Sequence, residues 1–277
     1  MFKKRFLSSV VLVIILAVVM IIGGNVLFAF TLLISLIALS EMNKATGVRM
    51  KNQKMNALEV VGIMGVLSYY GVRLFANTET YIMLTITMTI ILSMFVYVFL
   101  FPKYHSNQVM ASVFAFLYAP IMLSYIYLTR QLESGIYIVW LIFVSSWICD
   151  TCAYLVGITI GKHKMTPKLS PKKSIEGGIG GVLGAILVGF IYAFVLIKIG
   201  VVTDKFIWVF PVIAGVGAVI SQIGDLAASA IKRNHDIKDY GKIIPGHGGI
   251  MDRFDSVIFT APMIYYLAVL LLHTNLY

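Results

Sequence analysis

Apolar runs long enough to cross a lipid bilayer recur along almost the whole chain of 277 residues. A helix needs about 20 consecutive apolar residues to cross about 30 Å of hydrocarbon. Because only 12% of the residues are charged and 60% are hydrophobic, a soluble fold would lack the polar side chains that cover its surface. The sequence therefore predicts an all-α, polytopic helical membrane protein with about nine transmembrane helices. We expect the spans at 6–22, 24–40, 57–75, 81–101, 109–129, 136–160, 178–198, 206–231 and 252–273.

Lys and Arg residues divide unequally between the two sides of such a bundle. With the N-terminus inside, eighteen of the 22 Lys and Arg residues fall on the inner side and four on the outer side. Cytoplasmic loops of membrane proteins carry the excess of positive charge. The sequence therefore predicts a multi-pass protein of the cell membrane with a cytoplasmic N-terminus. Membrane lipids are expected partners and nucleic acid is not, because no soluble domain is available to read a groove.

The polar features gather in the second half of the chain. We expect one integral-membrane domain over 1–277, in which 1–135 supplies N-terminal helices and 136–277 forms the catalytic part. The two basic loops of that part, 161–177 and 232–251, lie on the predicted cytoplasmic side. An active site built from them would face the cytoplasm.

Three acidic residues, Glu59, Asp150 and Asp225, lie well inside predicted spans. A carboxylate in hydrocarbon is costly unless it faces a cavity or a partner. Glu59 lies near the cytoplasmic start of its helix, where structural and functional roles are both open. Asp225 belongs to a polar stripe that repeats every three or four residues and so predicts a helix face that lines a hydrophilic cavity or packs on a polar helix. The stripe consists of Ser221, Gln222, Asp225, Ser229 and Lys232.

The loop 232–251 is basic and rich in glycine, and Asp252 opens the helix that follows it. Glycine lets a backbone approach phosphate oxygens, and the N–H groups at a helix start attract anions. Asp252 and Asp255 share one face of the first helical turn, where helix capping is the structural alternative. Topology brings Asp225 to the same membrane face. Two carboxylates with basic groups and a glycine-rich turn are what a metal–triphosphate site requires, with a hard cation such as Mg²⁺.

The other basic loop, 161–177, contains two prolines that favour an extended and shaped backbone. Its residues Ser170, Lys172 and Lys173 are candidates to bind phosphate. The glycines that follow the loop allow close helix packing, within the chain or at the interface of a homodimer.

A signature in the last third of the chain resembles that of the phosphatidate cytidylyltransferases (CDP-diacylglycerol synthases). It begins at Ser229 and ends at Asp255, and between them stand Lys232-Arg233, Lys238-Asp239, His247-Gly248-Gly249 and Asp252-Arg253. A second block of the same family is similar to Asp150-Thr151-Cys152-Ala153-Tyr154, followed by Ser170-Pro171-Lys172-Lys173-Ser174 and Glu176-Gly177. The resemblance covers about residues 145–256.

The resemblance implies that the chain joins CTP to phosphatidic acid, giving CDP-diacylglycerol and pyrophosphate for phospholipid biosynthesis. It also implies that Asp225 and Asp252 bind Mg²⁺, with a second metal or a monovalent cation left open. The basic side chains expected to hold CTP or lipid phosphates during catalysis are Lys172, Lys173, Lys232, Arg233 and Arg253. The remaining residues expected to contact substrate are Asp150, Ser170, Ser229, His247, Gly248, Gly249 and Asp255.

Two other functions remain open from the sequence. A cation-coupled transporter would use Asp150 and Asp225 as ion ligands within the membrane. However, the halves of the chain show no internal repeat, and the polar residues gather near one membrane face. The second alternative is a CTP-dependent transferase that acts on another lipid phosphate or on a polyprenol.

Overall fold

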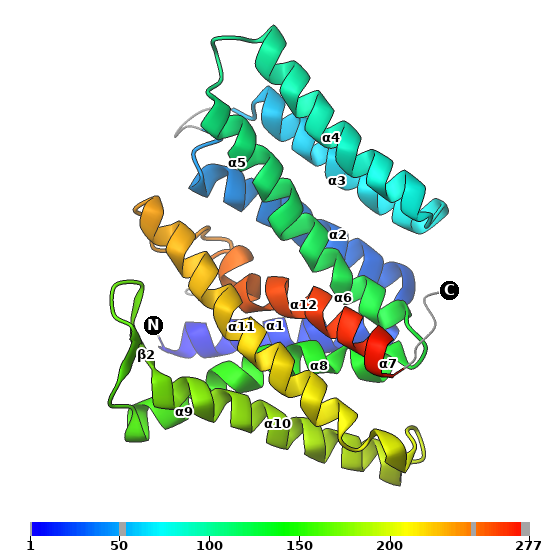
Figure 1. Cartoon of the computed structure of the whole chain (residues 1–277). Helices are drawn as coiled ribbons and strands as arrows, with labels where there is room; N and C mark the ends of the chain where they lie inside the picture. Colours follow the sequence, from blue (N-terminus) through cyan, green and yellow to red (C-terminus); the bar gives the residue numbers. More distant parts are fainter. Residues whose placement is uncertain (1, 50–53, 245–247, 273–277) are drawn as a thin grey trace. The chain divides into compact units, whose positions relative to one another are not determined.

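The computed structural model describes residues 2–49, 54–244 and 248–272, and helices dominate it (Figure 1). Its uninterrupted long helices are α1 (Phe2–Ile22), α2 (Gly24–Ala45), α3 (Ala57–Phe75), α4 (Glu79–Phe99), α10 (Ile175–Lys198), α11 (Val209–Asn234) and α12 (Met251–Leu271). Two further helical runs each contain a π-helical turn. They consist of α5 (Ser106–Phe116), η1 (Leu117–Ile121) and α6 (Met122–Gln131), and of α7 (Gly135–Ile138), α8 (Trp140–Phe143), η2 (Val144–Ile148) and α9 (Cys149–Ile160).

Within the described part of the chain, eight helical runs are long and apolar enough to cross a membrane. The predicted polytopic helical fold is therefore confirmed. The first predicted span corresponds to α1, whose described apolar part, Val10–Ile22, is shorter than the other eight runs. The break between the first two predicted spans falls at Gly23 and Gly24, whose φ angles are +65° and +49°. Glycine adopts this left-handed conformation without steric cost, so one helix ends and another begins there.

The chain forms two compact units whose segments alternate along the sequence. The first unit comprises Met1–Val19, Asn25–Ser124 and Asn234–Arg253, and the second comprises Met20–Gly24, Tyr125–Arg233 and Phe254–Tyr277. In the first unit α3 packs along α4, and α5 packs against both (Figure 1). Near the start of α3, a small apolar core consists of Val48, Leu58, Tyr104 and Val109.

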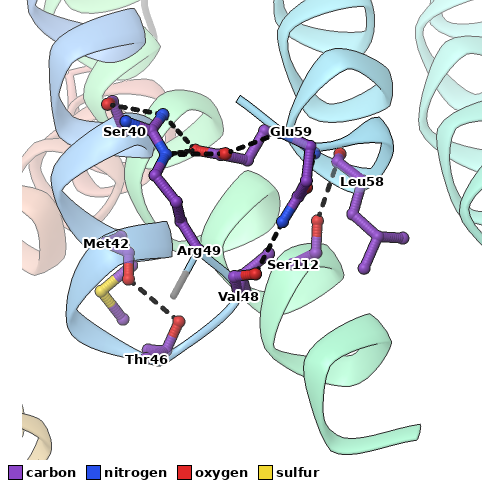
Figure 2. A network of polar contacts seen from close by, with 9 residues as sticks. Ser40, Met42, Thr46, Val48, Arg49, Leu58, Glu59 and Ser112 are labelled. Atoms are coloured by element: carbon purple, nitrogen blue, oxygen red, sulfur yellow. Dashed lines mark hydrogen bonds and ion pairs between the residues drawn. The ribbon is translucent and has the colours of Figure 1, made fainter. Parts of the chain in front are cut away.

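Glu59 belongs to a polar network of the first unit (Figure 2). Its carboxylate is 1% exposed and forms an ion pair with Arg49, whose Nε donates to Oε1 and Oε2 at 2.8 and 2.7 Å. Glu59 also forms a capping box with Asn56 at the start of α3. Because the carboxylate is buried among these donors, the structure supports the structural alternative for Glu59.

In the second unit α9 and α10 pack along one another (Figure 1). A Cβ atom at Gly177 would lie 2.7 Å from the carbonyl oxygen of Ala153, and one at Gly181 would lie 2.8 Å from that of Cys149. These glycines therefore allow α10 to approach α9 within a single chain. The homodimer stays a prediction.

The loop predicted to be extended forms a hairpin of β1 (Lys164–Thr166) and β2 (Ser170–Ser174), two antiparallel strands in an otherwise helical unit. Glu176 anchors the base of the hairpin, because it accepts hydrogen bonds from the backbone N–H groups of Lys162 and His163 at 3.1 and 3.2 Å. The Ser174 hydroxyl accepts a hydrogen bond from the Gly177 N–H and caps α10. The hairpin is thus fixed to the helix that follows it.

Candidate active site

A pocket with a volume of about 490 Å³ opens in the second unit, between the hairpin and the helices α9, α10 and α11. This volume lies in the range of about 300–1,000 Å³ that is usual for small-molecule sites. Both carboxylates and ammonium groups line it. The charged lining residues are Asp150, Lys164, Lys172, Lys173 and Asp225.

The elements of the second unit position these charges. Lys172 and Lys173 are neighbours on β2, and both line the pocket. Lys172 is exposed, whereas the Lys173 side chain is 27% exposed and its Nζ atom forms an ion pair with Asp225 Oδ2. The Ser229 hydroxyl donates to Asp225 Oδ1 at 3.4 Å, one helical turn away on α11. The Asp225 carboxylate is thereby held at the pocket wall while remaining 24% exposed.

Two residues of the predicted polar stripe line this pocket, Gln222 and Asp225. The Gln222 amide donates to the carbonyl oxygen of Gly178 at 2.9 Å and so connects α11 to α10. These two residues of the stripe therefore lie on the wall of a pocket.

A second charged pair of the same unit lies on α11 and α12. Lys232 Nζ lies 4.0 Å from Asp255 Oδ2, and the two side chains are 15% and 16% exposed. Asp255 and Lys232 therefore form a second carboxylate–ammonium pair in this unit.

Tyr240, Gly248 and Gly249 of the glycine-rich loop belong to the first unit, where they lie next to Asp252. This side chain is 8% exposed, and its Oδ2 atom accepts hydrogen bonds from the N–H groups of Tyr240 and Gly249 at 2.8 and 2.9 Å. Gly248 has a φ of +84°, and a Cβ atom there would lie 2.7 Å from Asp252 Oδ2. The loop therefore needs glycine at 248 both for its backbone conformation and for its approach to Asp252.

The N–H groups at the start of α12 donate to the protein's own carboxylates. Gly249 donates to Asp252, and Met251 donates to Glu41 Oε2 at 2.9 Å. Binding of a phosphate by the N–H groups at this helix start stays a prediction. The capping alternative for Asp252 also stays open, because the N–H groups of Tyr240 and Gly249 that donate to its carboxylate precede α12.

The other predicted site residues lie at several places. Ser170 opens β2 but is not part of the pocket lining, and Arg233 is exposed near the end of α11. Arg253 is partly buried in the first turn of α12. His247 lies outside the described residues, so the expected contact of its side chain with substrate stays a prediction.

Two residues of these assemblies were missed by the sequence reasoning. Lys164 was missed because only the pairing of β1 with β2 places it in the pocket. Glu41 was missed because the predicted span ended at residue 40, whereas α2 continues to Ala45. An acidic residue directly after a long apolar run was the available signal.

The donor atoms suit a hard divalent cation. Carboxylate oxygens are the ligands that Mg²⁺ prefers, and Mg²⁺ is commonly held by one or two carboxylates together with substrate phosphates and water. A cage of three or more His, Cys, Asp or Glu side chains is absent among the residues that the structure describes. Asp225 and Asp252 fit as individual ligands because hydrogen bonds orient each carboxylate.

Residues 3–271 match the sequence model of the Cytidylyltransferase family. A phosphatidate cytidylyltransferase of Staphylococcus saprophyticus is 29% identical over 270 residues, which cover 95% of this chain and 97% of the relative. Relatives of the same name from Staphylococcus epidermidis and Staphylococcus aureus are 31% and 30% identical over 266 and 269 residues, with the same coverage. The similarity thus includes the N-terminal helices, where hydropathy was the only feature apparent from the sequence.

Proposed function

This chain belongs to the cytidylyltransferase family, and from that premise we propose that it transfers the cytidylyl group of CTP to phosphatidic acid. The products are CDP-diacylglycerol, a precursor for phospholipid biosynthesis, and pyrophosphate. Family membership confirms both the resemblance seen in the signature and the prediction of an enzyme. The alternative of a cation-coupled transporter has no such support.

The observation that carries the proposal is the mixed charged and apolar lining of the pocket. Lys164, Lys172 and Lys173 suit phosphate groups, and Asp150 and Asp225 belong to the same lining. The lining also includes Tyr154 and Ile158, which are 67% and 63% exposed on a helix that is apolar enough to cross a membrane. A substrate with a phosphate head and acyl chains matches both kinds of lining residue.

The reaction needs no protein base. A phosphate monoester has a second pKa of about 6, so a lipid phosphate oxygen is already ionised near neutral pH. This oxygen attacks the α-phosphorus of CTP in line with the bond to the bridging oxygen of pyrophosphate. The new phosphorus–oxygen bond forms as that bond breaks, and pyrophosphate leaves with the electron pair.

The basic side chains would orient the two anionic substrates and neutralise charge as pyrophosphate leaves. We assign this role to Lys172 and Lys173 at the pocket. We also assign it to the basic residues of the signature, Lys232, Arg233 and Arg253. Lys173 is paired with Asp225, so binding of a substrate phosphate would exchange one anionic partner of this lysine for another. Asp150 and Asp255 would orient the basic side chains.

Asp225 and Asp252 would hold Mg²⁺, which supplies charge neutralisation at the phosphates of CTP when bound. The chain's own part is to orient both carboxylates. Ser229 contributes to this at Asp225, and the N–H groups of Tyr240 and Gly249 contribute at Asp252. We place the site on the cytoplasmic side, where CTP is available and where the excess of Lys and Arg is expected.

The test uses the purified full chain in mixed micelles with phosphatidate, labelled CTP and Mg²⁺. We expect labelled CDP-lipid and pyrophosphate in equal amounts, with both lost on chelation and in Asp252→Asn. Asp204→Asn is the matched control, because Asp204 is exposed and far along the chain from the signature. Parallel reactions replace phosphatidate with a lysophosphatidate or a polyprenyl phosphate.

Each result has a defined meaning. Product from polyprenyl phosphate but not from phosphatidate would replace the proposed acceptor with the alternative one. Absence of product from every acceptor, in protein that elutes as a single folded species, would overturn the proposed activity.

A further inference from the structure

Glu41 is a buried carboxylate at the end of α2 that the proposed reaction does not use. Its side chain is 3% exposed, and a carboxylate buried to this extent is costly unless donors surround it. Oε2 accepts a hydrogen bond from the N–H of Met251, the first residue of α12, at 2.9 Å. Oε1 has no hydrogen-bond partner among the described residues.

Two glycines of the loop 240–251 make room for this carboxylate. A Cβ atom at either Gly241 or Gly249 would overlap Oε1 of Glu41. Both entry and exit of the loop therefore approach the same side chain. The absence of a side chain at 249, which the sequence suggested was for phosphate approach, is here accounted for by Glu41.

Gly249 connects Glu41 to Asp252. Its Cα lies against the Glu41 carboxylate, while its N–H donates to Asp252 Oδ2 at 2.9 Å. Tyr240, next to Gly241, donates to the same Asp252 oxygen at 2.8 Å. Displacement of either glycine would therefore move a donor of Asp252.

We propose that Glu41 is a positioning residue that holds the loop 240–251 and thereby sets the orientation of the Asp252 carboxylate. The proposal rests on the proposed function for its catalytic consequence, but the contact itself does not depend on that function. Groups that orient a metal ligand through hydrogen bonds are worth about 10- to 100-fold in metal affinity or activity. Glu41 would act on Asp252 indirectly, because it contacts the backbone of Gly249 and Met251 and not Asp252 itself.

The first test measures amide hydrogen exchange without metal or substrate. Full-length wild type, Glu41→Ala, Glu41→Gln and Glu79→Gln are compared in detergent with chelator. Glu79 is 74% exposed and lies in the same unit, so its substitution is the matched control. In Glu41→Ala we expect the amides of Tyr240, Gly249 and Met251 to exchange about 10-fold faster or more, with α3 and α4 unchanged.

The second test measures the Mg²⁺ dependence of CDP-lipid formation. In both Glu41 variants we expect the Mg²⁺ concentration for half-maximal rate to rise about 10-fold, while the KM for phosphatidate stays within twofold of that of Glu79→Gln. A purely structural role would lower thermal stability and leave the Mg²⁺ dependence of the folded fraction unchanged. Should Glu41→Ala fail to fold, Glu41→Gln keeps the side-chain volume and tests the same point.

A third test uses the overlap between Gly241 and Glu41. In the wild-type background, Gly241→Ala should strongly reduce the rate of CDP-lipid formation. In the Glu41→Ala background we expect a reduction at least about fivefold smaller, because the Glu41 carboxylate that the new Cβ atom would overlap is then absent. Equal reductions in the two backgrounds would overturn the proposal, as would unchanged exchange of the three amides. An inactive wild type with faster exchange in Glu41→Ala would reject the proposed function and leave the loop contact supported.

Discussion

Two ion pairs of this protein combine the same types of charge but differ in their surroundings. In the first unit the Glu59 and Arg49 side chains are 1% and 17% exposed (Figure 2). In the second unit Asp225 and Lys173 are 24% and 27% exposed and lie on the wall of a 490 Å³ pocket. The enclosed pair has its hydrogen bonds supplied by the protein. The open pair can exchange partners with a ligand, which is the property that a site for phosphates requires.

The comparison predicts its largest effect at Asp225. Asp225→Asn removes the charge but keeps the shape, and we expect the rate of CDP-lipid formation to fall about 1,000-fold with the melting temperature little changed. The rate is measured with labelled CTP, and Asp204→Asn serves as the control. If Asp225→Asn keeps its activity within a few-fold and instead loses stability, this pair would resemble the enclosed one.

The second largest effect is expected at Lys173, the partner of Asp225. Lys173→Gln is expected to reduce kcat/KM for CTP about 100-fold, because one positioned donor for developing charge is lost. Lys168→Gln is the matched control, since Lys168 is exposed in the same hairpin but does not line the pocket. Steady-state rates over a range of CTP concentrations give the answer. Equal effects of both variants would indicate general electrostatic attraction and not a placed contact.

The enclosed pair should show the opposite behaviour. Glu59→Gln leaves Arg49 without its anionic partner, and we expect the free energy of unfolding to fall by about 3 kcal/mol while the activity of the folded fraction is unchanged. Unfolding in detergent measures the stability. Glu79→Gln, which removes an exposed pair at 3.7 Å, should change it by less than about 0.5 kcal/mol. Loss of activity in stable Glu59→Gln protein would contradict the assignment of a structural role to the Glu59–Arg49 pair.

The smallest effect tests the packing beneath the pocket. Gly181→Ala places a Cβ atom 2.8 Å from the Cys149 carbonyl oxygen, and we expect a loss of about 1–2 kcal/mol in unfolding free energy as α10 moves from α9. Gly71→Ala is the control, because nothing lies within 4 Å of its added Cβ atom. The same unfolding assay compares the two. A loss no greater than that of Gly71→Ala would show that α10 can shift at little cost.

Most of the fold and four of the five charged residues that line the pocket could be predicted from the sequence. The spans followed from hydropathy, and the stripe that contains Gln222 and Asp225 followed from helical periodicity, since both depend on residues close along the chain. The place of Lys164 in the pocket could not be predicted. It depends on the strand register, which places Lys164 opposite Ser174 and so selects which side chains enter the pocket.

The sequence by itself determined the membrane class of this protein, its helical spans and its family, because apolar length and a linear signature are local properties. Only the tertiary structure decided which carboxylates are enclosed and which face a pocket. Glu59 and Asp225 look alike as acidic residues within apolar runs, yet their partners differ. Glu41 and Met251 are separated by 210 positions and still share a hydrogen bond. Such pairs arise from the packing of distant helices, and no local pattern encodes them.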